Sequence, residues 1–93
     1  MHLVLLYTLA DDYLERRGPL REEHLGLARA AADRGELVLA GAFDAPADRA
    51  LLVWSTEDEQ VVRRFVAADP YVAQGLVRAW EIRRWNVVVG AAT

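Results

Sequence analysis

The longest amphipathic stretch of the chain is residues 20–35, LREEHLGLARAAADRG. At about 100° per residue, its apolar positions fall on one arc and its charged positions fall opposite. His24 is the exception, because it lies near the middle of the apolar arc, where a helix normally places a leucine. Pro19 is suited to open a helix and Gly35 to cap one, so we predict a helix from Pro19 to Arg34. Its apolar arc holds Leu20, Leu25, Leu27, Ala28, Ala31 and Ala32.

A second helix is predicted to follow residue 56. Thr56 and Glu59 have the spacing of a capping box, with Thr56 as the N-cap. The helix continues to about Ala68 and ends at Asp69-Pro70, since the residue before a proline avoids the helical region. When the helical wheel is extended by one residue, Asp69 falls in the apolar arc, at the helix end where a carboxylate is unfavourable. The apolar stripe of this helix is Val61, Val62, Phe65, Val66 and Ala68.

Four short apolar segments are predicted to be strands: residues 2–9, 36–43, 50–54 and 77–83. The first three are apolar at both alternating positions, which is typical of strands buried on both faces. In the fourth, the alternation changes phase near Arg83 and Arg84, which indicates a bulge or a change of partner there. Short helical turns are expected over 12–17 and 71–76, a polar loop over 44–49 and a tail over 90–93.

The resulting order, β-α-β-β-α-β, predicts an α+β, ferredoxin-like fold in a single domain over residues 1–93. This arrangement places both helices on one face of a four-stranded antiparallel sheet. If the other face met water, it would show regular polar positions, but the first three strands do not. We therefore predict a homodimer, in which two sheets pack face to face or close into a shared dimeric α/β barrel.

Composition narrows the class of partner. The net charge of −3 is spread along the chain, which argues against nucleic acid and against anionic membrane surfaces. All eleven basic residues are arginine and there is no cysteine, so neither a lysine Schiff base nor a thiolate nucleophile is available. Neither a metal nor a cofactor is expected, and no apolar run approaches the roughly 20 residues of a membrane span. These features predict a cytoplasmic protein with a small-molecule ligand.

His24 and Asp69 are the main candidates for chemistry. Because the two helices of this fold run antiparallel, the start of the first should neighbour the end of the second, and we expect the two side chains to meet. A histidine–aspartate pair fixes the imidazole tautomer and stabilises its protonated form, which suits a general acid and base near neutral pH. The structural alternative is that His24 is a satisfied core residue and Asp69 a turn former.

Four further residues are candidates for substrate contact. Arg21 precedes His24 and is either an anchor for an anionic substrate or a solvated helix residue. Tyr7, at the end of the first strand, and Tyr71, after the Asp-Pro turn, either line a pocket or only pack. Gly41 lies inside a strand and marks a bulge or a place where a ligand or another backbone comes close.

Four stretches of the sequence resemble one protein family over almost the whole chain: YLERRGPLREEHL, the LAG of the second strand, ADPYVAQGLV and WEIRRWNVV. They are similar to YciI-like (YCII-related domain) proteins. The resemblance implies a ferredoxin-like dimer related to the dimeric α/β barrels, with an active site centred on His24 of REEHL and Asp69 of ADPY. Ala42 and Arg84 stand where the family commonly has proline, so a different pocket wall and a longer last strand are expected.

The resemblance also implies a class of activity. One relative is a dehydrochlorinase of chlorinated hydroxyhydroquinone breakdown, and the wider superfamily includes muconolactone isomerase and cofactor-free monooxygenases. We hypothesise lyase- or isomerase-type proton transfer on a cyclic or aromatic compound, without a cofactor. A non-catalytic ligand-binding or accessory domain is the alternative, and a haem-binding or oxygen-using protein is a third. A hydrogen-bonded pair at a solvent-reachable pocket favours an enzyme, whereas a pair sealed among packed side chains favours a structural role.

Overall fold

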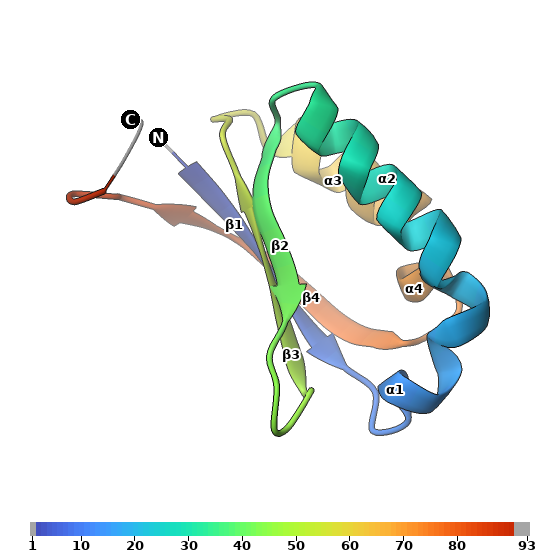
Figure 1. Cartoon of the computed structure of the whole chain (residues 1–93). Coiled ribbons are helices and arrows are strands. Elements are labelled where there is room, and N and C mark those ends of the chain that lie inside the picture. Colours follow the sequence, from blue (N-terminus) through green and yellow to red (C-terminus); the bar gives the residue numbers. More distant parts are fainter. Residues whose placement is uncertain (1, 91–93) are drawn as a thin grey trace.

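The strands and the two main helices follow one another in the predicted order, β-α-β-β-α-β (Figure 1). The computed structural model describes residues 2–90, so residues 91–93 of the predicted tail lie outside the described part. The elements are β1 (His2–Leu9), α1 (Tyr13–Arg16), the 3-10 turn η1 (Gly18–Leu20), α2 (Arg21–Asp33), β2 (Leu37–Ala42), β3 (Arg49–Trp54), α3 (Glu59–Ala68), α4 (Pro70–Ala73) and β4 (Val77–Trp85).

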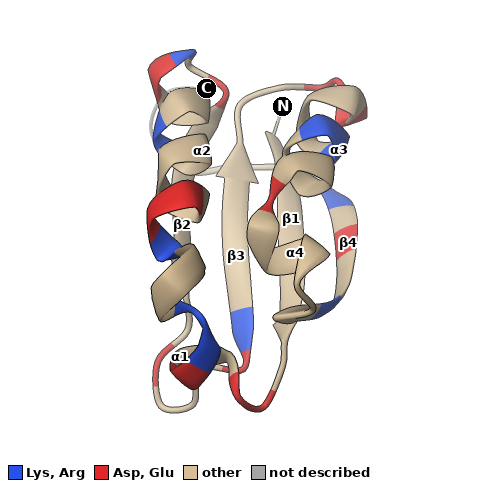
Figure 2. Cartoon of the chain, turned by 90° about the vertical axis from the view of Figure 1, so that its right-hand side faces the viewer, with Lys and Arg blue, Asp and Glu red and all other residues tan. Residues whose placement is uncertain are grey.

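The four strands form one antiparallel sheet in the order β2-β3-β1-β4. Figure 1 shows α2 and α3 side by side on one face of this sheet, running in opposite directions, with no helix on the other face. The α+β, ferredoxin-like fold is therefore confirmed. Figure 2 views the helical layer, in which α3 continues into the short α4 at the level where α2 begins.

The core lies between the helices and one face of the sheet. Burial alternates along β1, where Leu3, Leu5, Tyr7 and Leu9 are buried and the intervening residues are half-buried. The prediction that this strand is buried on both faces is therefore wrong within a single chain, because both helices cover the same face. The other members of the core include Leu52, Trp54, Val62, Phe65 and Leu76.

Helix α2 contacts the core less closely than its wheel predicts. Ala31 is its only fully buried residue, while Leu27 and Ala28 are half-buried against the core and Ala32 is exposed. Beyond Arg34, Gly35 has a φ of 80°, and the Glu36 N–H donates to the carbonyl of Ala31. Gly35 thus provides the predicted C-terminal stop, since the left-handed conformation favours glycine.

The start of α3 differs from the predicted capping box. Asp58, not Thr56, is the N-cap, and its carboxylate accepts from the Gln60 N–H at 2.9 Å. Thr56 instead accepts from the Asp58 N–H at 3.1 Å, one turn before the helix. Both a threonine hydroxyl and a carboxylate can accept the capping hydrogen bond, but only the carboxylate carries a negative charge that interacts favourably with the positive end of the helix.

The irregularity of β4 lies at the opposite end from the predicted one. The register between β1 and β4 shifts where Leu9 pairs with Val77 and Thr8 with Ala79, so Arg78 is the extra residue. Around Arg83 and Arg84 the pairing with β1 is regular and continues to Trp85. The bulge predicted there is wrong, and the longer last strand is confirmed. No helix in the stretch from residue 2 to residue 90 has the length and apolar character needed to cross a membrane.

Candidate active site

Asp69 lies in the junction between α3 and α4 and is fully buried. It belongs to neither helix, because its backbone is extended (φ −74°, ψ 117°), as the following Pro70 favours. Its side chain caps α4, where Oδ1 accepts from the Tyr71 N–H at 3.0 Å. Asp69 therefore lies at the end of α3 on the buried side, as the wheel predicts, and the sequence reasoning missed only that its carboxylate also caps the start of α4.

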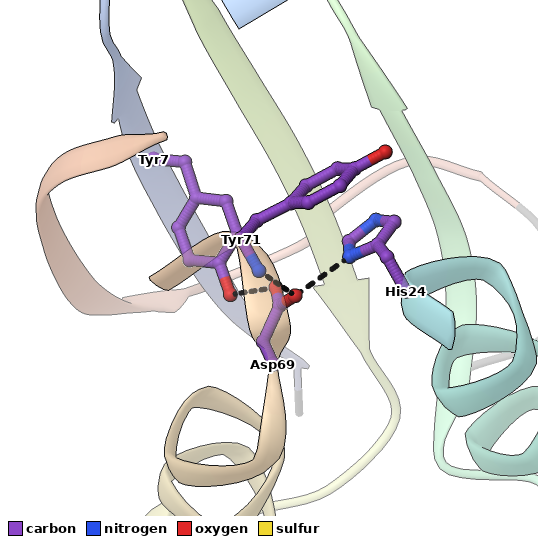
Figure 3. Close-up of polar contacts among 4 residues, drawn as sticks. All are labelled: Tyr7, His24, Asp69 and Tyr71. Atoms are coloured by element: carbon purple, nitrogen blue, oxygen red, sulfur yellow. Dashed lines mark hydrogen bonds and ion pairs between the residues drawn. The ribbon is translucent and has the colours of Figure 1, made fainter. Parts of the chain in front are cut away.

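The predicted meeting of His24 with Asp69 is confirmed. Nδ1 of His24, in the second turn of α2, lies 2.9 Å from Oδ1 of Asp69, and Oδ2 accepts from the Tyr7 hydroxyl at 2.7 Å (Figure 3). The three groups around the carboxylate are thus two side chains and one backbone N–H. An ionised carboxylate only accepts hydrogen bonds, so this network assigns the imidazole hydrogen to Nδ1. In the neutral form of the imidazole, Nε2 then carries the lone pair.

Aromatic rings hold the His24 imidazole in place. The Tyr71 ring is stacked on it, with centroids 3.9 Å apart and planes 10° from parallel. Phe65 of α3 contacts it edge-on at 6.2 Å. Together with the Nδ1 hydrogen bond, these contacts restrict rotation of the ring, so that Nε2 keeps one direction on the side away from Asp69 (Figure 3).

A cavity of about 410 Å³ opens beside His24. It lies between α2 and the sheet, and side chains from α1, α4 and the loop after β2 close its ends. The side chain of His24 is 15% exposed, whereas that of Asp69 is 0% exposed. The imidazole therefore reaches the cavity and the carboxylate lies behind it. The apolar part of the wall includes Leu9, Leu14, Leu25, Ala28, Phe43 and Ala47.

Tyr7 lines the cavity with its ring and directs its hydroxyl to Asp69. Burial raises the pKa of this phenol, and the neighbouring Asp69 charge and their hydrogen bond raise it further. The hydroxyl therefore stays protonated and donates to the carboxylate. This side chain, which was expected either to line a pocket or only to pack, also orients Asp69.

The remaining sequence candidates line the same cavity. Arg21 and Tyr71 contribute side chains, while Gly41 contributes backbone, and a Cβ added to Gly41 would meet nothing within 4 Å. Gly41 pairs regularly with Leu51, so it does not mark a bulge; the irregularity of β2 lies between Leu37 and Leu39. Residue 42, where the family commonly has proline, also lies in the wall.

Three polar residues of the cavity wall were missed by the sequence reasoning. Tyr13 begins the short helix α1, Arg17 follows its last residue, and Asp44 lies in the loop after β2. The guanidinium of Arg17 lies 5.5 Å from the centre of the Tyr13 ring, a cation–π contact with i, i+4 spacing. In the sequence, only this spacing indicates that Arg17 and Tyr13 lie together on a helical turn, and the Gly18-Pro19 pair that follows argues against a helix there. Within residues 2–90, no three His, Asp or Glu side chains gather as metal ligands.

Solved structures with the same fold include enzymes. The structure of 5-chloro-2-hydroxyhydroquinone dehydrochlorinase from Burkholderia phenoliruptrix, in complex with 2,5-dihydroxybenzoquinone, has a TM-score of 0.76 and 20% identity over 92% of this chain and 94% of that chain. A NIPSNAP family protein from Agrobacterium tumefaciens has a TM-score of 0.54 and 20% identity over 89% and 90%. An antibiotic biosynthesis monooxygenase has a TM-score of 0.56 and 8% identity over 95% and 98%. At these identities, the similarity shows a shared fold.

The sequence comparison is more specific. No curated protein matches the chain significantly. The family model of the YCII-related domain matches residues 1–86, a range that includes β1 to β4 and every residue named around the cavity. The chain therefore belongs to the YCII-related domain family.

Proposed function

We propose that the protein is a cofactor-independent enzyme that catalyses lyase- or isomerase-type proton transfer on a cyclic or aromatic compound. The observation that carries this proposal is the hydrogen bond from His24 Nδ1 to the buried Asp69, which leaves Nε2 free beside the cavity. A purely structural histidine would be expected to have both ring nitrogens satisfied or sealed in the core.

In the proposed reaction, Nε2 of His24 removes a proton from a ring carbon next to a carbonyl group. The electron pair of the broken C–H bond forms a carbon–carbon double bond, and the negative charge passes to the carbonyl oxygen. In a lyase, a leaving group on the adjacent carbon then departs with its bonding pair. In an isomerase, the imidazolium returns the proton to a different carbon. Asp69 stabilises the imidazolium in both cases.

The dimensions of the cavity support a substrate with a single ring. Ligand pockets usually have volumes of about 300–1,000 Å³, so a cavity of about 410 Å³ is at the small end of that range. Its walls combine aliphatic side chains with the Tyr7 and Tyr71 rings. The dehydrochlorinase that shares the fold was solved with 2,5-dihydroxybenzoquinone, a compound with a single ring.

The experiment is a thermal-shift screen of small phenols and lactones, 2,5-dihydroxybenzoquinone included, followed by turnover assays on the compounds that bind. Ligands that bind the folded state raise its melting temperature. We expect His24→Gln to lower turnover about 10²–10⁴-fold, the usual contribution of a general acid or base. His2→Gln is the matched control, because His2 lies on β1 and is absent from the cavity wall.

Full turnover by His24→Gln would overturn the proposed mechanism. Compounds that bind without any turnover in the wild type would instead favour the alternative, a non-catalytic ligand-binding or accessory domain.

We also propose that the protein is a homodimer joined through the uncovered sheet face. The residues of β1, β2 and β3 that point away from the helices are mostly apolar, and the side chain of Leu39 is 68% exposed in the single chain. Burying such a face removes apolar surface from water. The outward apolar residues are Val4, Leu6, Leu39, Leu51 and Val53.

Sedimentation at micromolar concentration tests this interface. We expect a dimer for the wild type and a monomer for Leu39→Asp, which places a charge on the apolar face. Ala67→Asp is the control, because Ala67 is exposed on α3 in the helical layer. A wild-type monomer, or a dimer that persists in Leu39→Asp, would contradict the proposed interface.

A further inference from the structure

We propose that the wall of the His24 cavity holds a carboxylate-binding subsite formed by Arg17, Arg21 and the Tyr71 hydroxyl, and that the ring compound it takes bears a carboxylate. This inference deepens the proposed function, on which it rests, by naming the class of substrate. Three donor residues from separate elements line this cavity, and each has a feature that a bound carboxylate would explain.

The two arginines come together because the chain turns sharply between them. Arg17 follows α1, and Arg21 begins α2. The 3-10 turn between them, with Pro19 near its start, folds α1 back beneath the first turn of α2, and both arginines line the cavity that His24 lines. Figure 2 shows the basic stretch that joins α1 to α2 at the foot of the helical layer.

Neither arginine is neutralised by a carboxylate of the described chain. The arginines in ion pairs there include Arg16, Arg34 and Arg63, but not Arg17 or Arg21. Asp12 pairs with Arg16 at 3.6 Å. Asp44 lines the cavity from the loop after β2, so the wall carries two guanidinium groups and one carboxylate. Asp69 is absent from the wall and already accepts three hydrogen bonds. Positive charge therefore predominates in the cavity wall.

The Tyr71 hydroxyl is the third donor. Tyr71 is 2% exposed, and its hydroxyl has no hydrogen-bond partner of good geometry among residues 2–90. Burial raises the pKa of this phenol, and Tyr13 raises it further, while the positive charges of Arg21 and Arg17 and a hydrogen bond with the Arg21 side chain lower it. Both arginines line the same cavity as Tyr71, whose buried hydroxyl lacks an acceptor, and buried polar groups without partners are uncommon in native proteins.

A carboxylate matches these three donors better than a neutral group does. Guanidinium groups bind the two oxygens of a carboxylate through paired N–H donors, and a phenol hydroxyl can donate to either oxygen. The Tyr71 ring is stacked on the His24 imidazole, so the Tyr71 hydroxyl lies about one ring length from His24 (Figure 3). A ligand whose carboxylate is held by these donors therefore places its ring along the apolar wall, beside Nε2 of His24.

Benzoate and benzamide are matched probes, because they differ in the charge of one substituent. Their binding to the ¹⁵N-labelled protein is measured from amide chemical shifts at constant ionic strength. We expect benzoate to shift the amides around His24 and Arg21 and to bind at least tenfold more tightly than benzamide. Arg17→Gln and Arg21→Gln should each weaken benzoate binding about tenfold, and Tyr71→Phe about threefold. Arg29→Gln, an exposed change further along α2, should leave it within twofold.

Equal affinity for benzoate and benzamide would overturn the subsite, as would unchanged benzoate binding in the Arg17→Gln, Arg21→Gln double variant. Tighter binding of inorganic phosphate than of benzoate would overturn the assignment to a carboxylate. His24→Gln separates this inference from the proposed function, because it should still bind benzoate. If benzoate binding depends on the arginines but no ring carboxylate is turned over, the subsite stands and the proposed enzyme activity is contradicted. If turnover depends on His24 but not on the arginines, the enzyme activity stands and the subsite is contradicted.

Discussion

Replacing Asp69 with asparagine tests whether the buried carboxylate holds His24. Asp69 accepts from the Tyr7 hydroxyl, the Tyr71 N–H and His24 Nδ1, at 2.7, 3.0 and 2.9 Å. Asparagine keeps one acceptor oxygen and replaces the other with an NH₂ donor. At the Oδ1 position, the NH₂ group would face two donors, the Tyr71 N–H and His24 Nδ1. We therefore expect the NH₂ group at the Oδ2 position, where it faces the Tyr7 hydroxyl. The Tyr7 hydroxyl must then reverse and leave its hydrogen without an acceptor.

The expected loss of stability follows from that count. One buried donor without a partner costs about 1–3 kcal/mol, and loss of the charge weakens the two hydrogen bonds that remain. For a domain of this size, each kcal/mol lowers the melting temperature by about 4–8 °C. Turnover should fall about 10²–10⁴-fold, because a neutral amide cannot stabilise the His24 imidazolium as a carboxylate does.

Two measurements check the Asp69→Asn prediction without a known substrate. Thermal melts followed by circular dichroism give the stability change, and ¹⁵N chemical shifts of the imidazole report which ring nitrogen carries the hydrogen. In the wild type we expect the Nδ1–H tautomer. Asp33→Asn is the control, because Asp33 is exposed at the far end of α2. A melting temperature and imidazole shifts that match the wild type would refute the idea that Asp69 positions His24.

Four further substitutions test individual elements. Stability should fall as the pH rises above about 10, because the raised pKa of Tyr7 makes the folded state bind more protons than the unfolded one. The chain has no lysine or cysteine to titrate in the same pH range, so Tyr7→Phe should make the free energy of unfolding, measured by urea titration, fall less steeply with pH. Equal slopes for the variant and the wild type would contradict the raised pKa of Tyr7. Gly35→Ala should cost about 1–2 kcal/mol through its φ of 80°, measured by thermal melts, since its Cβ would meet no atom. Asp58→Ala should destabilise the fold by about 1 kcal/mol in urea titrations and Thr56→Ala by less; the reverse order would restore Thr56 as the cap.

The secondary structure and its order were largely predictable from local patterns. The apolar arc of residues 20–35, the Asp-Pro break after residue 68 and the four apolar segments all depend on neighbours within one or two helical turns. The errors are of two kinds. Thr56 and Asp58 are both good caps, and the sequence does not say which adopts the extended backbone. The β4 irregularity at Arg78 depends on its register with β1, which the phase of one strand alone does not reveal.

The His24–Asp69 pair was predictable because both residues interrupt an apolar pattern. A polar side chain directed at a core requires a partner, and antiparallel helices bring the two ends together. The roles around the pair were less accessible. Tyr7 reads as an ordinary strand tyrosine, and nothing near it in the chain indicates that its hydroxyl binds a carboxylate 62 residues away. Arg17 reads as a surface residue, because the turn that directs it to the cavity follows it.

By itself, the sequence determined the elements, their order and the two polar residues misplaced on apolar faces. These depend on backbone preferences and on the period of apolar positions, which neighbouring residues set. Only the tertiary structure decided that Asp69 caps α4, that Tyr7 and His24 share its carboxylate, and that Arg17, Arg21 and Tyr71 face one cavity. Those contacts join residues far apart along the chain, and they form only where packing of the helices on the sheet excludes water and leaves each buried polar atom to find a partner.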